Sequence, residues 1–183
     1  RTGRGVLEVL LMRSLRQFQS HRAEPMVLQG EADAKLAVLA AAGLLDGDCR
    51  LTDRGRAAAC IQVAVDELLV ASLLLGGGTA SIGDADILVA FFSVFVNDTQ
   101  EDEEVPTPEA LAPLWRLCET HLLQLDQLER QHGLQPGPPE RRLQGLRCRA
   151  GLVEATLLWQ KGASFGEASA AAGGPDADGL LAR

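Results

Sequence analysis

Apolar residues recur at intervals of three and four along most of the chain, the spacing that gathers them on one face of an α-helix. Residues that favour strands are few, because aromatic residues make up only 4% of the chain and tyrosine is absent. The pattern therefore predicts an all-α fold, a helical bundle of about six to eight helices. The predicted helices cover residues 6–20, 31–45, 52–75, 82–96, 107–131, 140–160 and 164–172.

The distribution of apolar residues around each predicted helix indicates which faces are buried. Residues 82–96 are apolar almost all round, which is typical of a helix at the centre of a bundle. Trp159 continues the apolar stripe of the helix 140–160, so we expect it in the core rather than at a surface that stacks on bases. The helix 107–131 carries a single apolar stripe, formed by Leu111, Leu114, Trp115, Cys118, Leu122, Leu125 and Leu128.

The end of the chain carries clear start and stop signals. Gly162 can take the positive φ that ends a helix, and Ser164 with Glu167 has the spacing of a capping box that begins the next one. The Gly-Gly-Pro run at 173–175 stops that helix, and an aspartate just after it can cap another. Because the sequence ends at Arg183, about two turns into this last helix, we expect a bundle that is truncated at its C-terminal side.

The N-terminal side differs from the rest in one respect. Asp46-Gly47 is a turn signal between short apolar pieces, placed between the helix 31–45 and the helix that starts at Thr52 or Asp53. This order of helix, turn, extended piece and helix suggests the remnant of a winged-helix-like element. We therefore expect an N-terminal helical segment over residues 1–50 and a helical bundle over residues 51–183. The acidic stretch 97–106 is most simply a solvated linker.

Charge and composition narrow the function further. A net charge of −8 argues against binding to nucleic acid by bulk attraction, which needs clustered Lys and Arg, but permits local contacts. The apolar run 68–75 is far shorter than the ~20 residues of a membrane span, and no signal-peptide cleavage site follows the basic N-terminus, so we expect no membrane partner. The cysteines have no metal-ligand spacing, so we expect buried or partly buried reduced thiols at Cys49, Cys60, Cys118 and Cys148.

Sequence signatures of catalysis are missing from the chain. It has no GxxxxGKS/T phosphate loop, no GxSxG or HExxH motif and no paired-cysteine zinc signature. Asp66 and Glu67 are adjacent on a predicted helix and point about 100° apart, which suits them poorly to act on one substrate. We expect one of them to be solvated and the other to pair with an arginine or a helix N-terminus. The chain alone is therefore predicted to be no enzyme, with no catalytic, cofactor-binding or metal-binding residues.

Three segments, in this order, resemble one family: the C-terminal helical domain, of DSHCT type, of the Ski and Mtr class of DExH-box RNA helicases that serve the RNA exosome. No single segment is specific, and their order and spacing carry the resemblance. The first segment is SLRQFQ at 14–19, which is similar to the family's SFxQFQ. The second is LTDRGRAA at 51–58 with Ile61, DELL at 66–69 and AFFSVFV at 90–96, which is similar to KGRVAxxI…DELLL…ALLSxFV. The third is Trp159, GASF at 162–165 and Asp178-Gly179 to Arg183, which is similar to WxxGASF…EGxxxR.

The resemblance implies an accessory function in RNA processing and 3′-end decay. In the family this helical domain packs on the motor domains and lines the path of single-stranded RNA, with a long helix as a ratchet-like surface. It implies as partners single-stranded RNA, the helicase motor domains, and the exosome with its adaptor proteins. ATP and Mg are cofactors of the family's motor domains, which do not occur in this sequence; the family's inserted arch is absent as well.

The family pattern also suggests which residues contact RNA. The arginine of EGxxxR lies near the RNA path in the family, and Arg183 occupies its position here; as the last residue it is equally compatible with an inert, frayed end. Arg142 and Arg149 belong to a run of arginines that can form a basic stripe or a solvated helix face. The alternative function is a helical protein-interaction domain without nucleic-acid binding. The QFQ stretch favours the nucleus, with the cytoplasm as the alternative.

Overall fold

The computed structural model describes residues 25–62, 65–96 and 101–172. The chain divides into two compact units, unit 1 (Arg1–Gln62 and Leu125–Pro136) and unit 2 (Val63–Gln124 and Gly137–Arg183). The helix predicted at 6–20 and the one predicted after residue 175 lie outside the described residues. The prediction of segments 1–50 and 51–183 stays a prediction.

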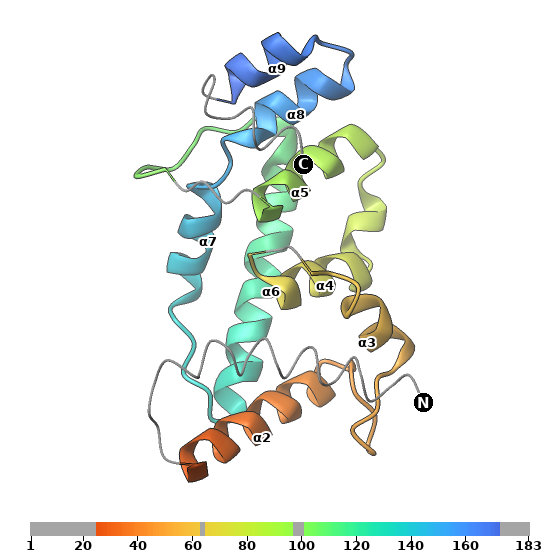
Figure 1. Ribbon diagram of the computed structural model, residues 1–183, viewed down its shortest axis with the longest axis vertical. Helices are drawn as coiled ribbons and strands as arrows, with labels where there is room; N and C mark the ends of the chain where they lie inside the picture. The colour runs from red at the N-terminus through yellow and green to blue at the C-terminus, as the bar shows by residue number, and fades with distance from the viewer. Residues whose placement is uncertain (1–24, 63–64, 97–100, 173–183) are drawn as a thin grey trace. The chain divides into compact units, whose positions relative to one another are not determined.

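The described part of the chain is helical, and the predicted all-α fold is confirmed (Figure 1). A single antiparallel bridge, between Leu45 and Leu51, is the one extended pairing among the described residues. The helices are α2 (Pro25–Ala41), α3 (Asp53–Ala58), α4 (Glu67–Leu75), α5 (Ala85–Val96), α6 (Ala112–Gln131), α7 (Pro139–Arg147), α8 (Leu152–Gln160) and α9 (Phe165–Ala171), with 3-10 turns η1 (Gly78–Ser81) and η2 (Glu109–Leu111).

Unit 1 is built around a tight connection between α2 and α3. Gly43 takes a φ of 73° after α2 ends, and Thr52 caps α3 by accepting a hydrogen bond from the Gly55 N–H at 3.0 Å. α3 lies so close to the preceding loop that a Cβ at Gly55 would come 2.0 Å from the Leu44 carbonyl oxygen. Glycine at position 55 is therefore required by the approach of two backbone segments.

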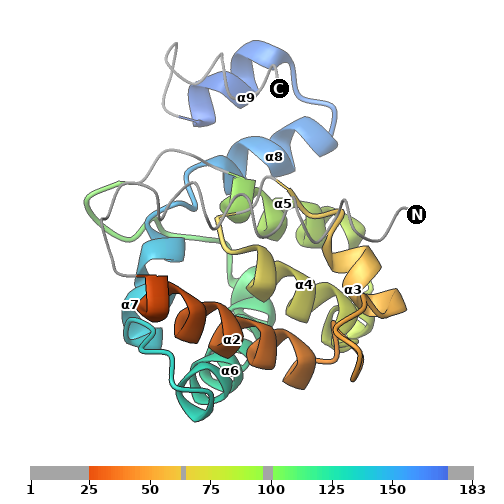
Figure 2. The same ribbon diagram turned by 60° about the horizontal axis from the view of Figure 1, so that its bottom comes forward.

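Unit 2 has α5 at its centre, as predicted. Phe91 and Phe95 are 0% and 1% exposed, and the Phe91 ring meets the Trp115 ring edge to face at a centroid distance of 5.1 Å. α5 contacts α7, α8 and η2, and Figures 1 and 2 show α8 beside both α5 and α9. The stripe predicted on residues 107–131 is confirmed, because its members Leu111, Leu114, Trp115, Cys118, Leu122 and Leu125 are all buried.

The helix predicted over 52–75 is wrong, because the structure divides it into α3 and α4. The Val65 N–H donates to the Phe95 carbonyl at 2.8 Å, so this residue is bound to the end of α5 instead of continuing α3. Asp66 then restarts the helix, since its Oδ1 accepts a hydrogen bond from the Leu69 N–H at 3.0 Å. The apolar spacing runs through this break, and the partner that causes it lies far along the chain.

The helix predicted over 140–160 is also wrong, because α7 ends at Arg147 and α8 begins at Leu152. The terminal carbonyls of α7 are used by another segment: the Glu101 N–H donates to the Cys148 carbonyl at 2.9 Å, and the Val105 N–H donates to that of Arg147 at 3.2 Å. The acidic stretch is thus more than the solvated linker that we expected. Its backbone docks on α7 while the side chains of residues 101–104 stay exposed.

Smaller differences concern helix starts. α5 begins at Ala85 and not at residue 82, because the Asp84 Oδ1 accepts from the backbone N–H groups of Asp86 and Ile87. α2 begins at Pro25 and ends at Ala41, several residues before the predicted ends at 31 and 45. The predicted end at Gln131, the positive φ of Gly162 and the capping box of Ser164 and Glu167 are confirmed.

Candidate nucleic-acid interface

Arg142, a predicted RNA contact, lies on α7 and is bound to a carboxylate. Its Nη2 donates to the Asp66 Oδ2 at 2.7 Å, and the two side chains are 23% and 22% exposed. The other oxygen of Asp66 caps α4. Asp66 therefore fastens α7 to the start of α4, which confirms that one member of the Asp66-Glu67 pair serves an arginine and a helix N-terminus. Glu67 is exposed.

Arg147, one turn further along α7, is held in a similar way. Its Nη1 lies 3.5 Å from the Glu104 Oε2, and its guanidinium carbon lies 5.4 Å from the centroid of the Trp115 ring. The Trp115 Nε1–H in turn donates to the Thr107 hydroxyl at 3.1 Å. The arrangement ties the acidic stretch, α6 and α7 together. Arg147 is thus engaged in packing within unit 2.

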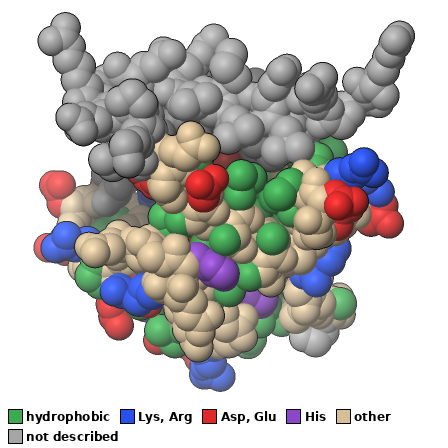
Figure 3. All heavy atoms as spheres, turned by 90° about the horizontal axis from the view of Figure 1, so that it is seen from below, with side chains coloured by type: hydrophobic (Ala, Val, Ile, Leu, Met, Phe, Trp, Pro, Cys, Tyr) green, Lys and Arg blue, Asp and Glu red, His purple; other side chains and the backbone are tan. Residues whose placement is uncertain are grey.

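The remaining predicted RNA contacts are placed differently. Arg149 is half-buried in the turn between α7 and α8, where its N–H donates to the Leu146 carbonyl at 2.9 Å. Arg183 lies outside the described residues. Figure 3, a view of one face, shows acidic, basic and hydrophobic side chains interspersed, with no continuous basic patch among the described residues on that face. Arg142 thus lies on α7 and Arg149 in the turn that follows it.

Trp159 is not in the core, and the prediction that placed it there is wrong. It is 55% exposed, and its ring meets that of Phe165, which is 43% exposed, edge to face at 6.4 Å. Because α8 begins only at Leu152, its buried residues are the early ones, and Trp159 falls in the last turn, past the contact with α5. Gly162, with a φ of 84°, then turns the chain so that the two aromatic rings meet.

The turn between α8 and α9 is fixed by its own side chains. The Ser164 hydroxyl accepts a hydrogen bond from the Glu167 N–H, and the Glu167 carboxylate accepts one from the Ser164 N–H at 2.8 Å. The Ser164 hydroxyl also donates to the Glu167 Oε2 at 2.7 Å, and this hydrogen bond, followed by the one from the Ser164 backbone N–H, lowers the pKa of Glu167. The exposed Lys161 is the C-cap residue of α8, two positions after Trp159 in the sequence. A base could stack on the exposed aromatic rings while Lys161 meets a phosphate.

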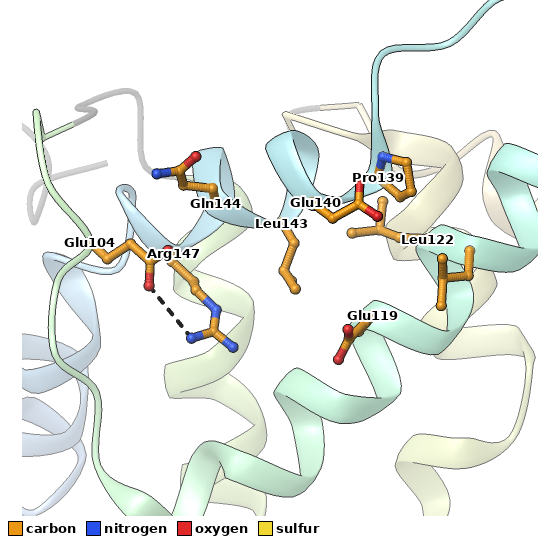
Figure 4. Close-up of a pocket in the computed structure, with 9 residues that line it drawn as sticks. Glu104, Glu119, Leu122, Pro139, Glu140, Leu143, Gln144 and Arg147 are labelled. Atoms are coloured by element: carbon orange, nitrogen blue, oxygen red, sulfur yellow. Dashed lines mark ion pairs between the residues drawn. The ribbon is translucent and has the colours of Figure 1, made fainter.

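A groove of about 150 Å³ runs between α6 and α7, and Figure 4 draws the residues that line it. Leu143 points from α7 toward α6, with Arg147 on one side of it and Glu140 on the other. Leu122 is 1% exposed, whereas the next residue, Leu123, is 50% exposed. Three carboxylates reach this groove from three elements: Glu104, Glu119 and Glu140.

A second, wider hollow of about 580 Å³ lies beside α8 in the same unit. Lys161 is the one basic residue among those that line it, and Glu101 and Glu154 are the acidic ones. The remaining lining residues are mostly small or apolar: Val105, Pro106, Thr107, Pro108, Ala150, Gly151, Leu157, Leu158, Ala171 and Ala172. Such a surface offers little to a phosphate and more to an apolar side chain.

Burial also shifts the pKa values of Cys118 and His121. Burial raises the pKa of the Cys118 thiol to about 12, with a smaller contribution from Asp66. Burial lowers the pKa of His121, whose Nδ1 lies 2.7 Å from the Ser72 hydroxyl oxygen. In the described ranges no three His, Cys, Asp or Glu side chains are grouped to hold a metal ion.

The cysteines divide into two pairs. Cys118 and Cys148 are buried and free, as predicted, but Cys49 and Cys60 are exposed, so the prediction of burial fails for these two. Cys49 lies in the turn of unit 1 with a φ of 57°. No helix of the described part is both long and apolar enough to span a bilayer.

Comparison with known protein families assigns this chain to a family. The family described as the DSHCT (NUC185) domain matches residues 48–177, well over half of the chain. The chain belongs to the DSHCT family. DSHCT domains are found in DExH-box helicases. A search of curated proteins returned no match.

The DSHCT match covers the segments that carried the resemblance from Leu51 to Phe165, whereas SLRQFQ at 14–19 lies before it and Asp178-Gly179 to Arg183 lies after it. Two features of the site were missed from the sequence. The exposed aromatic pair was hidden by the continuing apolar spacing of α8, although the WxxGASF turn was visible. The groove carboxylates gave no signal at all, since they come from three separate segments.

Proposed function

We propose that this DSHCT domain is a non-catalytic module of an ATP-dependent RNA helicase of the Ski and Mtr class, lining the path of single-stranded RNA toward the exosome. The observation that carries the proposal is the family match over residues 48–177, since such domains are found in DExH-box helicases. The helicase supplies ATP and Mg chemistry in its motor domains. This chain contributes a surface for the strand during RNA processing and 3′-end decay.

The proposed partners follow from this function. They are single-stranded RNA, the motor domains of the helicase, and the exosome with its adaptor proteins. The nucleus is the proposed location, with the cytoplasm as the alternative. No cofactor is proposed for this chain, and we expect it to release no phosphate from ATP.

The proposed RNA contacts are Arg149, Arg183 and Arg142, with the aromatic pair as a stacking surface. The exposure of Trp159 and Phe165 supports stacking, because an exposed aromatic face binds any base. At Arg142, a phosphate must compete with Asp66 for the guanidinium. Replacing Asp66 by Asn should therefore strengthen RNA binding if Arg142 contacts the strand, and leave it unchanged otherwise.

The experiment is a titration of the full chain with a fluorescein-labelled oligo-U strand at several salt concentrations. R149A combined with R183A should weaken binding and reduce the salt slope by about 0.7 for each phosphate that the variant no longer neutralises. Arg54 is an exposed arginine of α3, so R54A is the matched control and should bind as the parent chain does. Equal affinity of R149A/R183A and R54A would contradict the assignment of these arginines.

Stacking of RNA bases on Trp159 can be measured separately, by tryptophan fluorescence. The chain has two tryptophans, of which Trp115 is 6% exposed and Trp159 is 55% exposed. Bound RNA should quench the fluorescence of Trp159, and W159F should abolish the quenching while keeping an aromatic face. Quenching that persists in W159F would place the RNA away from the aromatic pair.

A second function, a helical protein-interaction module without RNA binding, is favoured by the net charge of −8 and the exposed acidic stretch. The same titration separates the two. No binding even at low ionic strength would favour this second function, because electrostatic contacts to phosphate are strongest there.

A further inference from the structure

The groove between α6 and α7 is lined both by leucine side chains and by carboxylates. Its base is apolar, formed by Leu122 and Leu143, and the half-exposed Leu123 adds apolar surface. Its edge is acidic, with three carboxylates and one guanidinium. Apolar and negatively charged groups therefore meet at one concave place on the surface.

The three carboxylates differ in their structural surroundings, and Glu119 is the one without a structural task among the described residues. Glu104 is paired with Arg147 at 3.5 Å. Glu119 and Glu140 are exposed, and neither makes a hydrogen bond or ion pair with the residues that the structure describes. Glu140 lies in the first turn of α7, where a negative charge suits the helix dipole. Glu119 lies within α6 and has no such role.

We infer that this groove binds a short basic segment of a partner protein, seating an arginine or lysine side chain on the leucines with its charged end against Glu119 and Glu140. Long basic side chains bury an aliphatic stem and keep the charge at the edge, which is the layout of this groove. A space of about 150 Å³ accepts a group of roughly the size of a benzene ring, so one side chain fits and a folded element does not.

The same charges decide against nucleic acid at this position. A phosphate entering the groove would meet three carboxylates, and the one guanidinium there is already bound by Glu104. A protein partner with an isolated basic residue between apolar neighbours has the complementary charge. This inference does not depend on RNA binding elsewhere on the DSHCT domain, and either one can fail alone.

The test uses the full chain and a short fluorescein-labelled peptide, Gly-Ser-Leu-Arg-Leu-Ser-Gly, with a matched peptide carrying citrulline in place of arginine. Binding is measured by fluorescence anisotropy at low and at high NaCl. The native chain should bind the arginine peptide more tightly than the citrulline peptide. E119Q/E140Q keeps the side-chain shapes and should weaken binding of the arginine peptide about tenfold.

The control separates a groove from a general attraction to an acidic protein. Glu103 and Glu109 are exposed glutamates of the same unit that do not line the groove, so E103Q/E109Q removes the same charge elsewhere. It should bind the arginine peptide as the native chain does. Circular dichroism of each variant should match that of the native chain, since all four glutamates are exposed.

Three results would overturn the inference. The first is no binding of the arginine peptide by the native chain. The second is an equal loss of affinity in E119Q/E140Q and E103Q/E109Q. The third is equal affinity for the arginine and citrulline peptides. L123S tests the apolar part separately: Leu123 is half exposed, so the variant should fold, and unchanged affinity would refute seating on the leucines.

Discussion

Removing the Asp66 side chain tests how unit 2 is held together. Asp66 has two tasks: its Oδ1 caps α4 through the Leu69 N–H at 3.0 Å, and its Oδ2 accepts from Arg142 at 2.7 Å. Loss of an N-cap costs about 1 kcal/mol. A charge-assisted hydrogen bond contributes about 1.5–3 kcal/mol when partly buried, as here at 22–23% exposure. D66A should therefore lower the free energy of unfolding by about 2.5–4 kcal/mol.

Two further variants separate the two tasks. D66N keeps an oxygen that can cap α4 but loses the charge that binds Arg142, so it should cost about 1–3 kcal/mol. R142M leaves the cap intact and leaves the carboxylate without its partner, which should cost a similar amount. Because the pair interacts directly, the double variant D66N/R142M should be more stable than the sum of the single losses predicts.

Urea unfolding followed by tryptophan fluorescence is the assay, since both tryptophans lie in unit 2. E103A removes an exposed carboxylate of the same unit and is the control, with an expected change within about 0.5 kcal/mol. The reasoning is refuted if D66A loses no more than E103A. Additive losses in D66N and R142M would instead refute the direct coupling between α4 and α7.

Three other predictions concern burial and close packing. At about pH 8, the exposed Cys49 and Cys60 should react with a thiol reagent at once, whereas the buried Cys118 and Cys148 should react only in urea. Burial also raises the pKa of the Cys118 thiol to about 12, which leaves little reactive thiolate. Fast reaction of all four cysteines would contradict the burial of Cys118 and Cys148. His121 is half-buried, and desolvation lowers its pKa, so the unfolded state binds the proton more readily; stability should be greatest above about pH 6.5 and fall as the pH drops, and H121Q should flatten this part of the urea-midpoint curve. G55A should lose about 1–3 kcal/mol because its Cβ would meet the Leu44 carbonyl, whereas G137A, with open space around it, should lose far less in the same urea titration.

Elements that carry their own end signals could be predicted from the sequence. Ser164 and Glu167 form the predicted capping box, and Gly162 has the predicted positive φ, because the atoms that satisfy these ends lie within a few residues. The centre of unit 2 was predictable for a related reason. A helix that is apolar all round, as α5 is, can only be stable when other helices cover it.

The breaks between helices could not be predicted, because their causes are distant in the sequence. α7 ends at Arg147 since backbone N–H groups of residues 101–105 use its last carbonyls. The break before α4 depends on Phe95, whose carbonyl binds the Val65 N–H. At both places the apolar spacing continues without interruption, so periodicity alone predicts one long helix where the structure has two.

The candidate site was the least predictable part. Arg142 lies 76 positions from its partner Asp66, so the pattern of arginines on α7 could suggest a basic stripe but not its neutralisation. Trp159 follows the spacing of a buried stripe, yet the helix that would bury it ends there. Periodicity places a residue on a face, but only tertiary packing decides how far along the helix that face is covered.

The placement of the arginines has a consequence for how the DSHCT domain would hold RNA. Arg142 and Arg147 are each bound by a carboxylate from another element, and these contacts fasten α7 within unit 2. An arginine that is already paired with a carboxylate neutralises little phosphate charge, so few counterions are released from the RNA when it binds there. Binding through Trp159 and Phe165 would then depend mainly on stacking, which salt affects little. A shallow salt dependence is therefore expected if Trp159 and Phe165 carry most of the binding, and a steep one would mean that phosphate contacts by cations other than Arg142 and Arg147 dominate.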